Sequence, residues 1–279
     1  MIKEKEGMEL TILSLGAGVQ STVLALMACR GELEHQPDHI IFSDTGDESR
    51  ATYKHLEWLE GIIRSSDIQY HKVTGGNIRQ DVVASMVTKE SIKQPPFFTK
   101  GDDQNGILRR KCTSQYKLDP IKKCQRKILG LKKGQRMPKG LKIIKLLGIS
   151  TDEVSRMKPS RDKWEDVHWP LIDMGMSRWS CYKWLQDNGY KVPPRSSCLI
   201  CPHHSNAYWR DMKDNSPDEF SDVCEFDDKV RFGIPAVKYP VYLHRSCTPL
   251  REVDLSTDID HGQFELDLYA GECEGICGT

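Results

Sequence analysis

The sequence predicts an α/β fold with a doubly wound, mostly parallel sheet and a cysteine-rich C-terminal extension. Apolar segments of four to seven residues alternate with longer segments in which apolar residues recur at helical spacing. Strands that alternate with helices in this way build a parallel sheet with helices on both faces. A chain of 279 residues, of which 38% are hydrophobic, is long enough for one sizeable domain of this kind with additions.

The first part of the chain supplies three strand and helix pairs. The expected elements are a strand over 10–13, a helix over 21–30, a strand over 39–43, a helix over 49–65, a strand over 69–73 and a helix over 77–88. In the second of these helices Tyr53, Leu56 and Leu59 recur at helical spacing, which indicates one buried face. The stretch 93–108 contains paired prolines and a Gly-Asp-Asp turn, so we expect a long loop of the kind that often forms a lid.

The second part of the chain has fewer strand signals. We expect a basic helix over 116–129, an inserted hairpin or disordered loop over 130–140, a strand over 143–149 and a helix over 177–188, followed by two short helices. These elements divide the chain into a nucleotide-binding α/β domain over 8–195, with a basic insertion at about 130–141, and a cysteine-rich helical extension with a mobile tail over 196–279.

Composition narrows the class of protein. No apolar run approaches the roughly 20 residues of a membrane span. The first residues lack the apolar core of a signal peptide. We therefore expect a cytoplasmic protein with no membrane contact. Ten cysteines in such a chain favour metal binding or redox chemistry over structural disulfides.

Positive charge is concentrated in one block, although the formal net charge is zero. From Arg109 to Lys145 there are 14 Lys and Arg residues and one acid, Asp119. Such a block indicates a polyanionic partner, with nucleic acid as one candidate. The alternative is a solvated, mobile insertion.

The segment 14–22, Ser-Leu-Gly-Ala-Gly-Val-Gln-Ser-Thr, is the most informative local signal. It joins an expected strand to an expected helix, and the free N–H groups at a helix N-terminus suit a phosphate or sulfate. The segment is neither a Walker loop nor a Rossmann fingerprint. The candidate binding residues are Ser14, Gly16, Gly18, Gln20, Ser21 and Thr22. The alternative is an ordinary glycine-rich turn.

A second polar segment, Asp44-Thr45-Gly46, follows the expected strand over 39–43. Ligands of open α/β sheets bind at the carboxyl ends of the strands. We therefore expect this segment and the loop 14–22 to share one crevice. An alternative role for Asp44 is as the N-cap of the following helix.

Cys198 and Cys201 form a C-x-x-C pair, the strongest metal-type signal in the chain. One pair is half a site, so further ligands must come from elsewhere. The candidates are Cys112, Cys124, Cys181, His203 and His204. Three alternatives follow: a [4Fe–4S] cluster, a zinc site completed by a histidine, or buried structural thiols. Cys29 lies in an apolar helix and is expected to be a core residue.

Several motifs together resemble the adenine-nucleotide α-hydrolases, also called the PP-loop or N-type ATP pyrophosphatase superfamily. The loop has Gln20 where ATP pyrophosphatases carry Asp, which makes it most similar to the phosphoadenosine phosphosulfate (PAPS) reductase family. The other matching motifs are Asp44-Thr45-Gly46 with Thr52-Tyr53, Leu146-Leu147-Gly148 with Ser155-Arg156 and Ser160-Arg161, Trp169-Pro170-Leu171-Ile172-Asp173, and Trp184-Leu185. The resemblance covers about 10–201.

The resemblance implies roles for individual residues. Lys117, Arg156 and Arg161 would contact the phosphate or sulfate of the nucleotide, which would be PAPS, adenosine phosphosulfate (APS) or ATP. A [4Fe–4S] cluster, or alternatively zinc, would be held by Cys112, Cys181, Cys198 and Cys201. Cys181 is chosen as the fourth ligand over Cys124. The tail cysteines Cys273 and Cys277 resemble the nucleophile that sulfonucleotide reductases carry at their C-terminal end.

Three functions are compatible with these expectations. The first is a PAPS reductase-like enzyme, in which a tail thiolate attacks the sulfonucleotide sulfur and a thioredoxin-like partner or glutathione reduces the enzyme afterwards. The second is ATP-dependent, iron–sulfur-assisted thiolation of a nucleic-acid base, which the basic block favours and Gln20 disfavours. The third is a non-catalytic, zinc-stabilised nucleic-acid-binding protein.

Overall fold

The computed structural model describes residues 9–90, 94–102, 104–257 and 260. Its centre is a five-stranded sheet with strand order β3-β2-β1-β6-β7, and every pair in it is parallel. The strands are β1 (Glu9–Leu15), β2 (His39–Asp44), β3 (Gln69–Thr74), β6 (Lys142–Leu147) and β7 (Glu165–His168). The strand order reverses its direction between β1 and β6, so the edge above these two strands is the switch point at which such sheets bind ligands.

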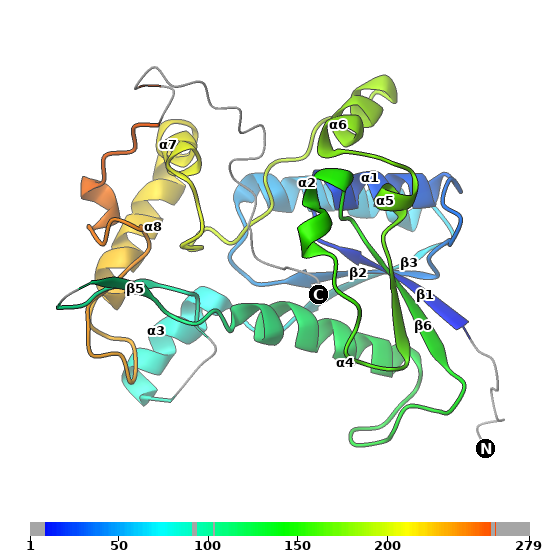
Figure 1. Cartoon of the computed structure of the whole chain (residues 1–279), viewed down its shortest axis with the longest axis horizontal. Coiled ribbons are helices and arrows are strands. Elements are labelled where there is room, and N and C mark those ends of the chain that lie inside the picture. The colour runs from blue at the N-terminus through cyan, green and yellow to red at the C-terminus, as the bar shows by residue number, and fades with distance from the viewer. Residues whose placement is uncertain (1–8, 91–93, 103, 258–259, 261–279) are drawn as a thin grey trace.

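Helices cover both faces of this sheet (Figure 1). One face carries α1 (Val19–Cys29), α2 (Arg50–Arg64), α5 (Pro170–Asp173) and α6 (Arg178–Asp187), and the other carries α4 (Asp119–Ile128). Every residue of α1 from Val19 to Ala28 is buried, because the helix lies between the sheet and the helices α2 and α6. The doubly wound α/β fold expected from the sequence is thereby confirmed.

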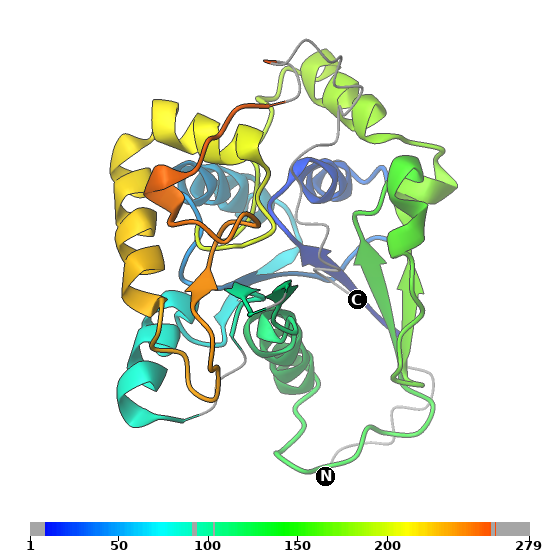
Figure 2. The same ribbon diagram turned by 60° about the vertical axis from the view of Figure 1, so that its left-hand side comes forward.

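A smaller unit with its own hydrophobic core lies beside the sheet. It contains α3 (Ile78–Thr88), α7 (Asn206–Asn215), α8 (Pro217–Val230) and an antiparallel sheet of order β5-β4-β8. These strands are β4 (Phe98–Lys100), β5 (Asn105–Ile107) and β8 (Val241–Tyr242). Figure 2 shows β8, in orange, beside the green β4–β5 hairpin, although the two are far apart in sequence. The core of this unit centres on Trp209 and Phe97, both fully buried.

The structure corrects several local expectations. The segment 93–108, expected to be a loop, contains the β4–β5 hairpin. The basic helix starts with a π-helical turn, η1 (Ser114–Leu118), which runs directly into α4. The segment 130–140 contains turns but neither helix nor strand. Strand β7, helix α5 and the 3₁₀ turns η2 (Thr151–Arg156) and η3 (Leu250–Glu252) were not expected.

The two short helices expected after the paired cysteines are present as α7 and α8. The domain boundary at 195 stays a prediction, and α3, which precedes it, packs against α8. None of the helices in the described part of the chain is both long and apolar enough to span a membrane.

Candidate functional site

The loop after β1 presents backbone N–H groups at the start of α1. Gly18 is the N-cap, and the first helical hydrogen bond runs from the Thr22 amide to the Gly18 carbonyl at 2.9 Å. The amides of Val19, Gln20 and Ser21 precede that bond and have no acceptor within the helix. The first turn also contains no acidic residue. A helix start of this kind suits an anionic group.

The conformation of this loop depends on Ser21 and Ala17. The Ser21 hydroxyl accepts a hydrogen bond from the Gly16 amide and donates one to the Gly18 carbonyl, both at 3.2 Å. The left-handed residue is the buried Ala17, with φ of 61°, whereas Gly18 has an extended backbone. A left-handed backbone therefore does not account for the glycines at positions 16 and 18. The two hydrogen bonds of the Ser21 hydroxyl hold the loop in this conformation.

Gln20 points toward the loop that follows β6. Its amide nitrogen donates to the Ser150 hydroxyl at 3.3 Å and to the Glu153 carboxylate at 3.0 Å. Glu153 also pairs with Arg156, which places that predicted phosphate ligand near the start of α1. The Gln20 side chain thus holds two loops of the switch point together.

Gly148, just after β6, lies against the backbone of α1. A Cβ atom at this position would lie 2.8 Å from the Ser21 nitrogen and 3.0 Å from the Ser21 Cα. The close approach of these two backbones therefore requires a residue without a side chain.

At the end of β2, Asp44 organises a turn. One carboxylate oxygen accepts from the Gly46 amide at 2.8 Å and from the Tyr53 hydroxyl at 2.9 Å, and the other lies 3.1 Å from the Lys72 ammonium. Gly46 has φ of 73°, a left-handed conformation that favours glycine. The N-cap role considered for Asp44 is wrong, because the Ser49 side chain caps α2.

Asp47 connects this turn to the C-x-x-C loop. Its carboxylate accepts from the Ile200 amide at 3.0 Å and forms an ion pair with Arg79 at 2.7 Å. Its carbonyl accepts from the Leu199 amide at 2.7 Å. Burial raises the pKa of Asp47 to about 6, and the Arg79 charge opposes this rise. The C-x-x-C loop is therefore docked directly on the carboxyl end of β2.

Cys112, Cys198 and Cys201 line one pocket, which we call the cysteine pocket. Its cavity volume is about 30 Å³, far below the roughly 300–1,000 Å³ of small-molecule sites, so as placed it has room for little more than a water molecule. Its other lining residues are Thr45, Ile78, Pro95, Pro96, Arg110, Thr113, Tyr116, Lys117, Ser197 and Ile200. Two cations, one of them the predicted ligand Lys117, thus border a largely apolar wall that carries three thiols.

Thr45 joins the thiol of Cys198 to a buried carboxyl group. The Cys198 thiol donates to the Thr45 hydroxyl at 3.2 Å, and that hydroxyl donates to Glu48 at 3.3 Å. Desolvation and the nearby Glu48 charge raise the pKa of Cys198 well above its ordinary value, and Lys117 opposes them. Burial likewise raises the pKa of Glu48 to about 7, again against the charge of Lys117.

The other proposed metal ligands lie elsewhere. Cys181 is fully buried in the core with α1, so the structure does not bring it to the cysteine pocket. Cys124 lies on α4 and is buried against the sheet. The ring nitrogen Nε2 of His204 lies 2.9 Å from the Cys198 carbonyl, and the ring stacks on Tyr208 with centroids 3.8 Å apart. His204 therefore contacts the backbone of the C-x-x-C loop.

Within the described residues, no three His, Cys, Asp or Glu side chains are gathered closely enough to hold a metal ion as placed. Thiolates are nevertheless the ligands that iron–sulfur clusters and zinc prefer. The three thiols thus fit such a group in kind, and they line one pocket, although they are not gathered around a single point as placed. The cluster and its alternative, zinc, stay predictions.

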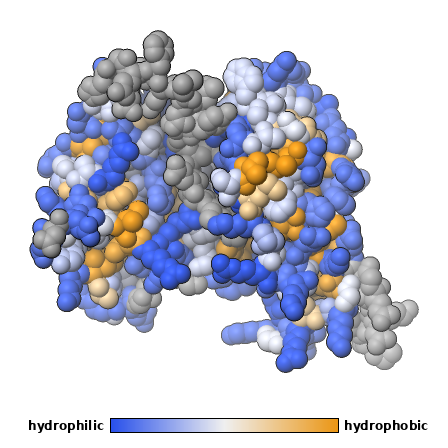
Figure 3. Space-filling view, viewed as in Figure 1, coloured by the Kyte–Doolittle hydropathy of each residue, from blue (hydrophilic) through white to orange (hydrophobic). Residues whose placement is uncertain are grey.

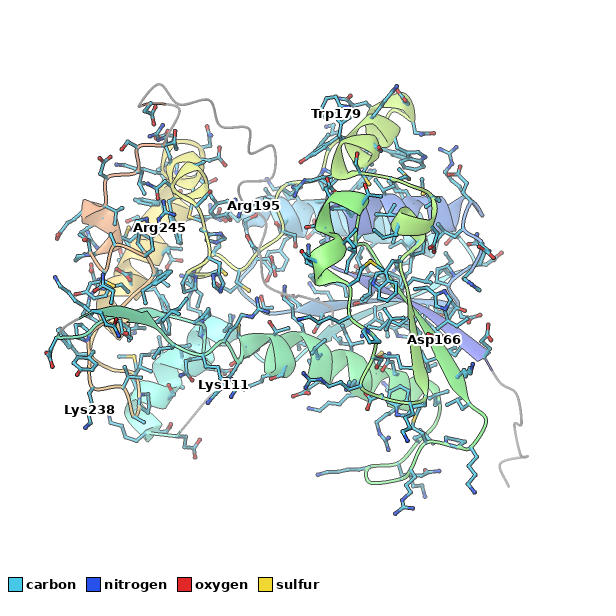
Figure 4. The ribbon with its side chains drawn as sticks, in the orientation of Figure 1. Lys111, Asp166, Trp179, Arg195, Lys238 and Arg245 are labelled. Carbon is cyan, nitrogen blue, oxygen red and sulfur yellow. The ribbon has the colours of Figure 1, made fainter. Side chains whose placement is uncertain are left out.

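Ser196 links the cysteine pocket to the loop after β1. Its hydroxyl donates to the Gly16 carbonyl, and the next two residues, Ser197 and Cys198, line the pocket. Arg195, just before them, lies between the sheet and the smaller unit (Figure 4), with its guanidinium 4.5 Å from the centroid of the Tyr208 ring. The candidate anion site and the thiols are therefore neighbours at one edge of the sheet.

The remaining predicted residues are placed as follows. Ser14 is half-buried in β1, Thr22 bonds to His55 at 3.0 Å, and Arg161 is exposed. Cys273 and Cys277 lie outside the described residues, so their catalytic role stays a prediction. Sequence reasoning missed Asp47, although it directly follows the Asp-Thr-Gly segment, and it missed Ser196, for which there was no local signal.

Comparisons with known proteins add little. No protein-family model and no curated protein matches this chain. Among solved structures, a U34-tRNA thiolase, NcsA from Methanococcus maripaludis with its [4Fe–4S] cluster, matches at 12% identity and a TM-score of 0.40. The alignment covers 99% of this chain and 82% of the thiolase chain. A likeness of this strength carries no functional argument, and the fold assignment rests on the sheet itself.

Proposed function

We propose that the protein is an enzyme that binds an adenine nucleotide at the loop after β1 and transfers sulfur at the cysteine pocket. One observation carries this proposal: the segment from Ser196 to Cys198 touches the Gly16 carbonyl at one end and lines the pocket at the other. Activation by a nucleotide and attack by sulfur must occur within bonding distance of each other. The contact of Ser196 with Gly16 supports such a placement.

The reaction class is ATP-dependent replacement of oxygen by sulfur. A carbonyl oxygen of the acceptor attacks the α-phosphorus of ATP, and pyrophosphate leaves. Hydrosulfide, supplied as a co-substrate, then adds to the activated carbon, AMP departs with the original oxygen, and the proton is lost to solvent. No electrons are gained or lost overall.

The chain's own residues divide this work. The free amides at the start of α1 hold a phosphate, while Gln20 and Gly148 keep the loops of the switch point in register. Arg110 and Lys117 attract an anionic sulfur species to the pocket. A [4Fe–4S] cluster bound by Cys112, Cys198 and Cys201 would supply a soft site for sulfur.

Gln20, which the resemblance counts against this function, has contacts that are compatible with it. An aspartate at that position is typical of the ATP pyrophosphatases that the loop resembles. Here the Gln20 amide is bonded to Ser150 and Glu153 and so has a structural role. The glutamine found in place of the aspartate thus contributes to the packing of the two loops.

Two measurements test the proposal. Gly18→Asp places a negative charge at the start of α1 and should abolish ATP binding in calorimetry. Gly61→Asp, which adds the same side chain on the open surface of α2, should leave binding unchanged. Equal affinities in the two variants would reject the nucleotide site.

The second measurement concerns the thiols. Protein purified without oxygen should contain iron and sulfide and absorb broadly in the visible range. Cys198→Ser should remove both, and Cys29→Ser should not. Purified protein that contains stoichiometric zinc and no iron would reject the cluster and favour a zinc site. ATP turnover in the presence of sulfide and acceptor that places no sulfur in the acceptor would exclude sulfur transfer.

A further inference from the structure

The exposed cations of the basic block form a row that starts at the cysteine pocket. Arg110 lines the pocket, and Arg109 and Lys111 flank it in sequence. Figure 4 shows Lys111 where the chain enters the rod formed by η1 and α4. On α4 itself, Lys123 and Lys127 are exposed and lie four residues apart, on one stripe of the helix.

The row continues beyond α4 into the loop that precedes β6. Lys132, Lys133, Arg136 and Lys139 are all exposed there. Figures 1 and 3 show this loop projecting from the molecule below the sheet, with a strongly hydrophilic surface. Arg126 fixes the loop against the end of α4, because its guanidinium donates to the carbonyls of Lys132 and Gln135.

Most of these charges are available to a ligand. The acids that pair with the block engage Lys122, which lies 2.6 Å from Asp162, and the buried Lys145, which lies 3.6 Å from Glu165. Within the described residues, no carboxylate pairs with Arg109, Arg110, Lys111, Lys123, Lys127, Lys132, Lys133, Arg136 or Lys139. The apolar residues of α4, such as Ile121, face the sheet. This surface therefore offers charge without apolar anchors.

We propose that the sulfur acceptor is a nucleic acid whose backbone lies along this row, with one unpaired nucleotide at the mouth of the cysteine pocket. The inference rests on the proposed function and names its substrate class. A row of cations fits a linear polyanion better than a single small anion. The ten residues of α4 span roughly 15 Å, the axial rise of four to five phosphates of one strand.

The geometry also requires the modified nucleotide to leave its helix. Arg110 and Lys117 stand at the pocket, and its wall includes Pro95 and Pro96. A base stacked inside a duplex does not reach such a wall, and enzymes that act on bases use single strands or flip the base out. Single-stranded substrates should therefore bind more tightly than a duplex of the same length.

Binding of labelled oligonucleotides to the full-length protein over a series of salt concentrations tests this inference. Wild-type protein should bind single-stranded RNA or DNA with a steep salt dependence. Replacing Lys132, Lys133 and Arg136 by Gln should flatten the log–log slope by roughly 2 units, about 0.7 for each lost phosphate contact. Replacing Lys191, Lys229 and Lys238, exposed lysines outside the block, by Gln removes the same charge and should leave the slope unchanged.

Arg110→Gln tests the pocket end of the row. It should reduce the log–log slope by about 0.7, the value of one phosphate contact. Arg245 is exposed on the smaller unit, so Arg245→Gln should leave the slope unchanged. An equal loss of slope in the two triple variants would overturn the inference, because any lysines on the surface would then attract the nucleic acid. Polyglutamate that binds as tightly as the oligonucleotide would overturn it too, because the row would then bind any polyanion.

ATP affinity, measured on the same samples, separates this inference from the proposed function. Protein that binds ATP but shows no salt-dependent binding of nucleic acid would overturn the acceptor and leave sulfur transfer standing. Wild-type protein that does not bind ATP would reject both the proposed function and the inference that rests on it.

Discussion

The carboxylate of Asp47 and the backbone amide of Ile200 lie 3.0 Å apart, although 153 positions separate them in the chain. This contact joins the end of β2 to the loop that carries Cys198 and Cys201. It fixes the position of the C-x-x-C loop relative to the loop after β1, since both β1 and β2 belong to the same sheet.

Asp47→Ala should destabilise the protein and loosen the C-x-x-C loop. The change removes the acceptor of the Ile200 amide and leaves Arg79 without its buried partner, a loss that typically costs about 3–5 kcal/mol. Urea unfolding measures the free energy, and the rate at which Cys198 reacts with a thiol reagent measures the loop. Asp222→Ala removes the other, exposed partner of Arg79 and should cost under about 1 kcal/mol. Unchanged thiol reactivity in Asp47→Ala would show that the loop is held by other contacts.

Gly148→Ala should weaken both folding and nucleotide binding. The new methyl group would meet the Ser21 backbone at 2.8 Å, and overpacking of this kind costs about 1–3 kcal/mol. Gly61→Ala, on the open surface of α2, is the matched control, because its methyl group would meet no atom within 4 Å. Calorimetry with ATP and urea unfolding of both variants check the prediction, which fails if the two behave alike.

The contribution of two buried histidines to stability should decline as the pH falls through the range of histidine titration, while the raised pKa values of Asp47 and Glu48 act in the opposite direction. Burial lowers the pKa of His55 to about 4 and that of His244 to about 4, against an ordinary value near 6.5. At these two histidines the unfolded chain therefore binds more protons than the folded chain below about pH 6.5, and the stability that they contribute above that pH is lost toward pH 4. When the pH is lowered from 7.5 to 5, the urea midpoint of His55→Gln, which can still bond to Thr22, should rise relative to that of the wild type, because the variant lacks the His55 contribution. An identical change in the two proteins would place the pH dependence on other groups.

The sulfonucleotide reductase expected from the resemblance makes a separate prediction. If a tail thiolate attacks PAPS, Cys277→Ser should abolish turnover and prevent a covalent adduct on the enzyme, detected by intact mass. Nucleotide affinity and the melting temperature should hardly change, because serine replaces cysteine by a side chain of nearly the same size. Cys273→Ser is the paired variant, since the register of the tail against the motif is ambiguous. PAPS reduction that depends on either thiol would favour reduction over ATP-dependent transfer.

The sequence predicted the large sheet better than the smaller one. Strands such as β1 and β6 are mostly apolar, so their burial can be predicted from their composition. Strands β4, β5 and β8 have two or three residues each and exist through pairings between distant segments, which no local pattern reports. The proline-rich start of this region therefore suggested a loop.

The candidate site was predicted in part for a similar reason. Cys112, Cys198 and Cys201 were expected to act together, and they line one pocket. Cys181 was chosen for its closeness in sequence, yet it shares a helical stripe with Leu185, and both pack into the core beside α1. The spacing of these two residues could have indicated burial. The contact of Asp47 with Ile200 depends on tertiary structure and had no signal in the sequence.

The two hydrophobic cores have different relations to the site. The loop after β1 belongs to the core around α1, whereas Ile78, Tyr116 and Ile200 of the cysteine pocket belong to the core around Trp209. Gradual heating or added denaturant should therefore disrupt the cysteine pocket and the proposed nucleotide site at different points. Loosening of the smaller core would open the thiols to reagents and oxygen while the nucleotide is still held, so inactivation would precede loss of the nucleotide.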